Sequence, residues 1–318
     1  MNKSATILFP CFNDWASLTL LIPKIIKYTT RDLKLKILIV DDGSTVERPS
    51  EFLDAFHDFK ENIKIIRLSR NLGHQRAIAI GLAYLNDEVP CHGDIIVMDA
   101  DGEDRPEDIL KLVFAAHDKL GLSIVFAERK RRSEGLLFKF GYFGYKLFHY
   151  ILTGKKIKFG NFSLIPEIQL KKVVTISELW NHYAAAVVIA RFPLILVPTN
   201  RAKRISGHSQ MNYSSLILHG LKAISVYSEN IGIRALIISF LLSAISLFFL
   251  SISLLMPNNT LINGFKENLV IICSLILIIS IILLTVVLFF TLFILHGRSS
   301  MNFIPERDYK YFVYNEKK

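Results

Sequence analysis

The chain has 318 residues, of which 51% are hydrophobic, and a formal net charge of +10 at neutral pH. Its mean hydropathy of +0.37 excludes an ordinary soluble enzyme, and its length allows one large domain with an appendage or two modest domains. The three cysteines show no metal-ligand spacing, so they give no indication of a cysteine-bound metal.

Short apolar runs and segments of helical periodicity alternate over the first 127 residues. The apolar runs, which predict strands, are residues 5–9, 35–40, 63–68, 94–98 and 123–127. The segments that predict helices are residues 14–28, 49–59, 74–85 and 106–119. This alternation predicts an α/β fold with a doubly wound, mostly parallel sheet, in which ligands bind beyond the carboxyl ends of the strands.

The pattern changes after residue 127. A basic run at 128–132 precedes an aromatic, amphipathic segment at 136–152, and a further strand is predicted at 194–198. Residues 213–229 predict a helix with a mixed face, which we expect to lie on a membrane surface.

Two uncharged runs near the C-terminus, residues 235–256 and 269–295, each exceed the about 20 residues that cross a hydrocarbon core. They predict a transmembrane hairpin; buried core helices are the alternative, but soluble helices rarely stay apolar all round for this length. Basic residues flank the hairpin and the loop between the spans is neutral, so the positive-inside rule places both termini and the catalytic domain in the cytosol. No secretory signal is recognised before residue 230.

The positive charge of the chain is compatible with two partners. Beside two spans, attraction to anionic head groups explains it more simply than nucleic acid does, so we expect a bilayer partner and no nucleic acid. The expected parts are 1–212 as the catalytic domain, 213–230 as an interfacial helix, 231–298 as the hairpin and 299–318 as a cytosolic tail.

Two acidic turns follow predicted strands. Asp99 and Asp101 end the strand at 94–98, and side chains two residues apart on a strand share a face, so both carboxylates can converge on one hard cation. Glu103 adds acidity to this turn. Asp41 and Asp42 open the other turn, where a carboxylate can accept hydrogen bonds from a base or ribose. Both turns have a structural alternative, because Asp and Gly are ordinary turn residues.

Basic residues are candidates for binding phosphate, because guanidinium groups bind phosphate oxygens in pairs. Arg129 opens a basic cluster just after the predicted fifth strand, and Arg201 and Arg204 form a second group before a Gly-His-Ser turn at 207–209. The alternative for the first cluster is a solvated face or a membrane-surface patch. For His74 and His208 a hydrogen-bonding or surface role is favoured over a metal role.

In chain order these motifs resemble the family 2 glycosyltransferases, specifically the polyisoprenyl-phosphate glycosyltransferases such as dolichol-phosphate mannose synthase and bactoprenol glucosyltransferases. The segments that carry the resemblance are Ile-Leu-Phe-Pro-Cys-Phe-Asn-Asp at 7–14, Val-Asp-Asp-Gly-Ser at 40–44, Leu-Ser-Arg-Asn-Leu-Gly at 68–73, Met-Asp-Ala-Asp-Gly-Glu-Asp-Arg-Pro-Glu at 98–107 and Arg-Ile-Ser-Gly-His-Ser at 204–209. The resemblance covers about residues 5–230 and implies a GT-A fold, a Rossmann-like catalytic domain that binds a nucleotide-sugar.

The resemblance also implies roles for individual residues. Those implied for the nucleotide-sugar are Pro10, Asn13, Asp41, Asp42, Asn71 and Asp99. Those implied for Mg²⁺ or Mn²⁺ are Asp99, Asp101 and Glu103. Those implied for the lipid phosphate are Arg129, Arg131, Lys139, Arg201, Arg204 and Ser209. Catalysis is expected to depend on Asp99, Asp101, Arg129 and Arg204.

Three positions depart from the family pattern. Gln210 stands where a Lys is frequent, and Lys139 stands about where a second phosphate-binding Arg is expected. Gly-Asn-Phe-Ser at 160–163 replaces the usual Gly-Asp-Phe-Arg, which puts in doubt an Asp that acts as catalytic base. If the acceptor is a lipid phosphate, its oxygen is already anionic at neutral pH and needs no general base, and a direct displacement predicts inversion at the anomeric carbon.

The expected function is metal-dependent, inverting transfer of a hexose from a nucleotide-sugar to a polyisoprenyl phosphate at the cytosolic face of the inner (plasma) membrane. Undecaprenyl phosphate is the favoured candidate for the acceptor. The product would be a lipid-linked sugar for envelope glycans. One alternative is a membrane polysaccharide synthase, against which stand the absence of a Gln-x-x-Arg-Trp motif and the presence of only two spans. The other is an inactive nucleotide-binding scaffold, which the altered segment at 160–163 favours and the intact Asp99 and Asp101 oppose. Whether the chain forms a homo-oligomer stays open.

Overall fold

The computed structural model describes residues 3–29, 33–89, 93–117, 121–129, 150, 152–154, 159–206, 213–256, 263–299 and 303–314. These residues belong to two compact units. The first comprises the described parts of Met1–Tyr142, Lys156–Val226 and Phe303–Lys318. The second comprises those of Phe143–Lys155 and Tyr227–Asn302.

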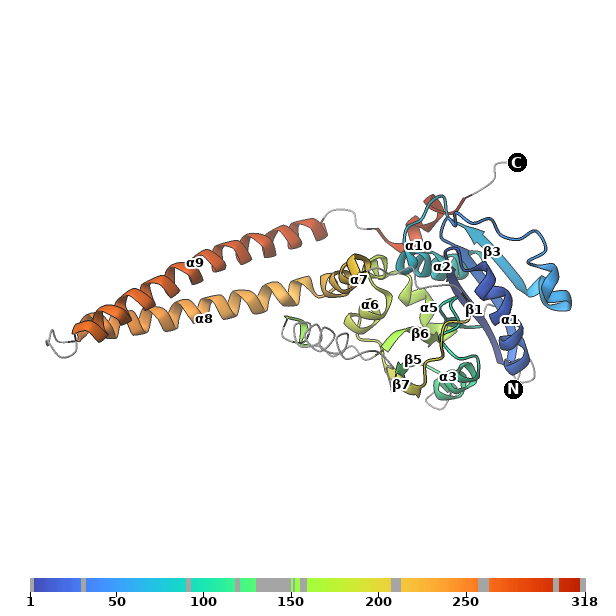
Figure 1. The fold of residues 1–318 in the computed structure, drawn as a ribbon, viewed down its shortest axis with the longest axis horizontal. Helices are drawn as coiled ribbons and strands as arrows, with labels where there is room; N and C mark the ends of the chain where they lie inside the picture. The colour runs from blue at the N-terminus through green and yellow to red at the C-terminus, as the bar shows by residue number, and fades with distance from the viewer. Residues whose placement is uncertain are drawn as a thin grey trace. The chain divides into compact units, whose positions relative to one another are not determined.

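A seven-stranded sheet organises the first unit (Figure 1). Its strands are β1 (Lys3–Cys11), β2 (Leu33–Asp41), β3 (Ile63–Arg67), β4 (Asp94–Val97), β5 (Ile124–Arg129), β6 (Phe159–Ile165) and β7 (Leu194–Thr199). Their order is β3-β2-β1-β4-β6-β5-β7, and β6 alone among them runs antiparallel to its neighbours. The predicted mostly parallel α/β sheet is therefore confirmed.

Helices cover both faces of this sheet. They are α1 (Trp15–Thr29), α2 (His74–Glu88), α3 (Glu107–His117), α5 (Glu167–Val173) and α6 (Tyr183–Ile189), with 3-10 helices η1 (Asp54–Asn62) and η2 (Ser177–Trp180). Helix α7 (Tyr213–Ser225) also belongs to this unit. Alternate residues of β1 divide between two apolar cores: Leu8 packs with α2, α5 and α6, whereas Ile7 and Phe9 pack with α1 and α3. This period of two is what a strand buried on both faces requires.

Two parts of the first unit differ from the predictions. The predicted helix at 49–59 is wrong: the chain forms turns and then η1, because this polar stretch fully buries only Phe52 and Phe56 in the core and His57 has a φ of 40°. The predicted helix at 213–229 ends earlier, with α7 closing at Ser225. Sequence reasoning also missed β6, α5 and α6.

The last described segment, residues 303–314, belongs to the first unit although it follows the apolar helices. Its short helices α10 (Pro305–Asp308) and η3 (Tyr309–Tyr311) lie beside α2 (Figure 1). Ser69 N–H donates to the Phe312 carbonyl at 2.9 Å, and Tyr314 N–H donates to the Arg67 carbonyl at 2.7 Å. The segment thus pairs with the chain just beyond β3.

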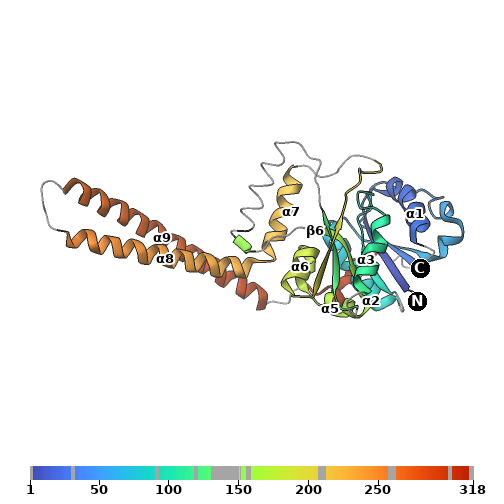
Figure 2. The ribbon, with the colours of Figure 1, turned by 90° about the horizontal axis from the view of Figure 1, so that it is seen from below.

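Two long helices, α8 (Ser228–Leu255) and α9 (Asn263–Ser299), make up most of the second unit and run side by side (Figures 1 and 2). By length and composition, Ser228–Leu255 and Gly264–Gly297 are apolar enough to cross a membrane. The buried positions of α8 are small residues seven apart, Gly232, Ser239, Ser246 and Ser253. Small residues at this interval let two helix backbones approach closely, so the apolar side chains are left to face outward.

Candidate active site

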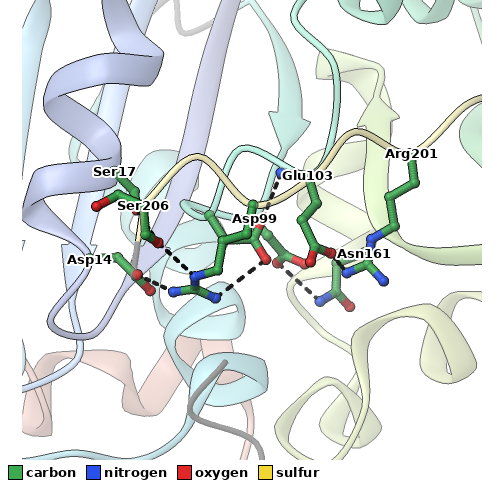
Figure 3. A network of polar contacts seen from close by, with 9 residues as sticks. Asp14, Ser17, Asp99, Glu103, Asn161, Arg201 and Ser206 are labelled. Atoms are coloured by element: carbon green, nitrogen blue, oxygen red, sulfur yellow. Dashed lines mark hydrogen bonds and ion pairs between the residues drawn. The ribbon is translucent and has the colours of Figure 1, made fainter. Parts of the chain in front are cut away.

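Four loops, those after β1, β2, β4 and β7, converge at the carboxyl edge of the sheet with the start of the antiparallel strand β6. Because β6 runs in the opposite direction, its first residues lie at the edge where its neighbours end. The loops after β1, β4 and β7 and the start of β6 contribute the polar network of Figure 3, which includes Asp14, Asp99, Asn161 and Arg201.

The first acidic turn, Asp41–Ser44, is held by backbone N–H groups. Asp41 Oδ1 accepts from Ser44 N–H at 2.9 Å. Asp42 Oδ1 and Oδ2 accept from the N–H groups of Leu72 and Gly73 at 2.7 and 2.8 Å. Both carboxylates are buried. Asp42 thus fixes the loop that precedes α2, which carries the exposed Asn71.

Asn13 connects the loops after β1 and β2. It adopts a φ of 60°, a conformation that Asn tolerates better than most residues, and its Oδ1 accepts from the N–H groups of Thr45 and Val46 at 2.9 Å each. Its Nδ2 donates to Thr45 Oγ1 at 3.0 Å. The Asn13 amide therefore shapes the loop after β2. Pro10 is buried in β1 opposite Val40.

The second acidic turn, Asp99–Glu103, is held by other side chains as well as by backbone. Asp99 Oδ1 accepts from Asn161 Nδ2 at 3.3 Å, as Figure 3 shows. Asp101 Oδ1 accepts from Glu103 N–H at 3.0 Å, and Asp101 Oδ2 lies 3.7 Å from a terminal nitrogen of Arg204. Glu103 forms an ion pair with Arg201 (Figure 3).

The backbone of the loop after β7 forms hydrogen bonds with the backbone of the second acidic turn. Ala202 N–H donates to the Glu103 carbonyl at 2.8 Å, and Ile205 N–H donates to the Asp101 carbonyl at 3.0 Å. Gly102, with a φ of 75°, lies against the Ile205 side chain, which leaves no room there for a Cβ. This backbone pairing is what delivers Arg201 and Arg204 to the acidic turn.

Arg204 bridges two carboxylates. Its guanidinium forms an ion pair with Asp14, and its Nε donates to the Ser206 carbonyl at 3.0 Å. Burial raises the pKa of Asp14, an effect that Arg204 opposes. With Asp101 on its other side, Arg204 joins the loops after β1, β4 and β7. Asp14 ends the first of the segments that resemble the family, but its ion pair with Arg204 was not predicted from the sequence.

Burial shifts the pKa of two further groups near the site. It raises the pKa of Asp42 to about 6, against the N–H groups of Leu72 and Gly73, which lower it. It lowers the pKa of His74, the first residue of α2, to about 4, and the charge of Lys222 acts in the same direction. His74 is therefore neutral at physiological pH.

The structure brings together Asp99, Asp101, Glu103, Arg201 and Arg204 from the predicted site residues. Arg129 ends β5 opposite Thr199, so its backbone lies at the same edge. Arg131, Lys139 and Ser209 lie outside the described residues, as does the Arg129 side chain. Among the described residues no group of three His, Cys, Asp or Glu side chains lies close enough to hold a metal ion. Glu103 forms its ion pair with Arg201.

Solved structures and curated relatives resemble this chain in different ways. The glucosyl-3-phosphoglycerate synthase of Mycobacterium tuberculosis, solved with Mn²⁺, UDP and phosphoglyceric acid, matches 72% of this chain and 79% of its own with a TM-score of 0.54 at 12% identity. This likeness shows a shared fold. An uncharacterized glycosyltransferase of Synechocystis sp. is 27% identical over 72% of this chain and 70% of its own.

The undecaprenyl-phosphate 4-deoxy-4-formamido-L-arabinose transferase of Enterobacter sp. (strain 638) is 33% identical over 135 residues. That alignment covers 41% of this chain and 38% of the relative, so the chain spans well under half of that protein's length. The glycosyl transferase family 2 domain matches residues 6–167, half of the chain, which include most of β1, all of β2 to β6 and both acidic turns. This chain belongs to glycosyl transferase family 2.

Proposed function

We propose that this chain transfers a hexose from a nucleotide-sugar to a polyisoprenyl phosphate, with undecaprenyl phosphate as the acceptor, at the surface of the inner membrane. The observation that carries the proposal is the second acidic turn, over which the loop after β7 places two arginines. Relatives named for sugar transfer to undecaprenyl phosphate are 33% and 31% identical to this chain over 135 and 140 residues, and the family 2 domain at residues 6–167 contains this turn.

The donor set of the second acidic turn fits a divalent cation. Carboxylate oxygens are the ligands that Mg²⁺ and Mn²⁺ prefer, and Mg²⁺ is commonly held by one or two carboxylates plus substrate phosphates rather than by an all-protein cage. Asp99 and Asp101 would hold the cation. When bound, it supplies charge neutralisation to the departing nucleoside diphosphate.

The arginines would act as preorganised donors to phosphate oxygens. Arg204 is already fixed by Asp14, Asp101 and the Ser206 carbonyl, so it lies in place before substrate arrives. An acceptor phosphate oxygen, already anionic, would form the new bond to the anomeric carbon while the bond to the donor diphosphate breaks. The electron pair leaves with the diphosphate, no proton need move, and the anomeric configuration inverts.

The apolar hairpin supports a lipid acceptor. The segments that flank it, up to Val226 and from Phe303, both belong to the first unit, which supports the proposal that both lie on one side of the membrane. If both helices cross the membrane, the chain returns to the side from which it entered. A soluble nucleotide-sugar and a lipid phosphate would then meet at the interface, with the catalytic unit on the cytosolic side.

The test is turnover by the purified full-length chain in detergent, with undecaprenyl phosphate, Mg²⁺ or Mn²⁺, and a panel of nucleotide-sugars, followed by mass spectrometry. We expect a lipid-phosphate-sugar that disappears in Asp101→Ala. Asp54→Ala, which removes an exposed carboxylate on η1, is the matched control and should retain turnover.

Other outcomes would replace the proposal. Glycan extension or donor hydrolysis without a lipid product would favour a polysaccharide synthase. Nucleotide binding without turnover on any donor would favour an inactive scaffold.

A further inference from the structure

A line of buried amides runs from α6 to the second acidic turn. Tyr183 N–H donates to Gln75 Oε1 at 2.5 Å, Gln75 Nε2 donates to Asn161 Oδ1 at 3.0 Å, and Asn161 Nδ2 donates to Asp99 Oδ1 at 3.3 Å. Gln75 and Asn161 are 4% and 8% exposed, so water does not compete for these bonds. We call Gln75 and Asn161 the amide relay.

The direction of the amide relay follows from its first bond. A backbone N–H can only donate, so Gln75 must present its oxygen to Tyr183 and its NH₂ group to Asn161. Asn161 must then accept with its oxygen, which leaves its own NH₂ group facing Asp99. The orientation of both amides is therefore fixed from both ends, by the backbone N–H at the start of α6, which can only donate, and by the Asp99 carboxylate, which can only accept.

The backbone of Asn161 is held as well. Ser163 Oγ donates to the Asn161 carbonyl at 2.8 Å and lies 2.7 Å from the Tyr183 hydroxyl. Ser163 is opposite Val97 in the register of β4 and β6, which ties this strand to the one that leads into Asp99. Both the main chain and the side chain of Asn161 are thus fixed before any ligand binds.

We propose that Asn161 is a positioning residue for Asp99 and that Gln75 acts through it, an inference that rests on the proposed metal-dependent transfer. An amide cannot take a proton at neutral pH, so Asn161 is not a base. Its NH₂ group instead holds one oxygen of Asp99 in a fixed direction, which orients the carboxylate for a divalent cation. Groups that orient metal ligands in this way are typically worth 10- to 100-fold in metal affinity.

The experiment measures Mn²⁺ binding to the purified full-length protein by electron paramagnetic resonance of free Mn²⁺, with the metal alone as probe. Asn161→Ala should weaken Mn²⁺ binding about tenfold. Gln75→Met, which has a similar length but no hydrogen bonds, should weaken it less, because Asn161 can still turn its NH₂ group to Asp99. The double variant should bind Mn²⁺ as weakly as Asn161→Ala and no more weakly.

This non-additivity separates the amide relay from a general packing effect, since independent defects would multiply. In turnover, both single variants should need more Mn²⁺ for half-maximal rate and regain most of the wild-type kcat at saturating Mn²⁺. Asn86→Asp, on the same helix as Gln75 but away from the relay, is the control and should bind Mn²⁺ like wild type. If Asn161→Ala does not fold, Asn161→Ser, too short to reach Asp99, replaces it.

Two results would overturn the inference: wild-type Mn²⁺ affinity in the Asn161 variant, or a loss in the double variant equal to the product of the single losses. A different result would reject the proposed function. If the wild-type chain neither binds Mn²⁺ nor turns over with any metal, metal-dependent transfer fails, and the positioning role fails with it.

Discussion

The two acidic turns of the catalytic unit have similar sequences but differ in their main partners, although Asp41 of the first turn also lies 3.6 Å from the Arg67 guanidinium and Asp101 of the second also accepts from a backbone N–H. Each follows a buried strand and contains a glycine with positive φ, Gly43 at 66° and Gly102 at 75°. In the first turn, Asp42 accepts from two backbone N–H groups. In the second, Asp101 lies against the guanidinium of Arg204, and Asp99 against the amide of Asn161.

The nature of these partners separates scaffold from site. A backbone N–H cannot leave without unfolding its loop, whereas a guanidinium on a side chain can exchange a carboxylate for a phosphate. The first turn therefore builds the loop before α2, and the second holds charges that a metal and a diphosphate can replace. Sequence alone cannot make this distinction, because both turns show the same residue types.

The largest expected effect is the loss of enzyme turnover when a carboxylate of the second turn is replaced. Asp101→Asn keeps the size of the side chain but removes its charge, so we expect kcat/KM to fall about 100- to 1,000-fold. The side chains of Asp101 and Arg204 are only 16% and 18% exposed, so the free energy of unfolding should also fall, and turnover is compared on variant protein shown to be folded. Asp54→Asn, on η1, should leave turnover intact. Equal losses in both variants would contradict the assignment.

The first turn should affect the free energy of unfolding and the way this free energy depends on pH. Burial raises the pKa of Asp42 from 3.8 to about 6, so the folded chain keeps this proton to a higher pH than the unfolded chain does. The stability that Asp42 contributes is thus fully present below about pH 4 and is lost as the pH rises through 6, a change of about 3 kcal/mol by linkage.

Asp42→Asn cannot titrate and isolates this contribution from that of other carboxyls, including Asp14. Urea unfolding from pH 4 to 7 should show the wild type losing about 3 kcal/mol relative to the variant. A difference in unfolding free energy that stays constant over this range would mean that Asp42 is not desolvated.

The two glycines offer a matched comparison of somewhat smaller size. An Ala at either position carries the cost of positive φ, about 1–2 kcal/mol. A Cβ at Gly43 would lie 2.6 and 2.7 Å from backbone atoms of Arg70 and Asn71, whereas one at Gly102 would meet the Ile205 side chain, which can rotate. Gly43→Ala should therefore destabilise the unit by at least about 2 kcal/mol in urea unfolding, and more than Gly102→Ala. The reverse order would show that the Asn71 loop yields easily.

Much of the fold followed from periodicity, since every strand predicted in the first 127 residues is present. The antiparallel β6 was missed because its sequence, with Gly160, Asn161 and Ser163 between apolar residues, reads as a loop until neighbouring strands bury it. The acidic turns and the two arginines of the loop after β7 were predicted as a site. Their pairing was not, because Arg204 meets Asp14 across 190 residues of chain, and no local pattern records that contact.

The segment at 303–314 was also missed because its contacts join residues that are far apart in the chain. It bears on the comparison of the two acidic turns because it braces the loop that the first turn holds. Tyr309, 1% exposed, donates to Asp87 at 2.7 Å, and its segment bonds to Ser69, two residues before Asn71. Tyr309→Phe removes one hydrogen bond from a carboxylate that keeps Lys310 at 2.6 Å, so unfolding should cost about 1 kcal/mol less.

Tyr311→Phe, at an 82% exposed position in the same segment, should leave the free energy of unfolding unchanged. If the segment only braces the first turn, Tyr309→Phe should raise the donor KM without lowering kcat, because the carboxylates of the second turn are untouched. A lowered kcat at saturating donor would instead mean that the two turns are coupled, and the division between scaffold and site would have to be withdrawn.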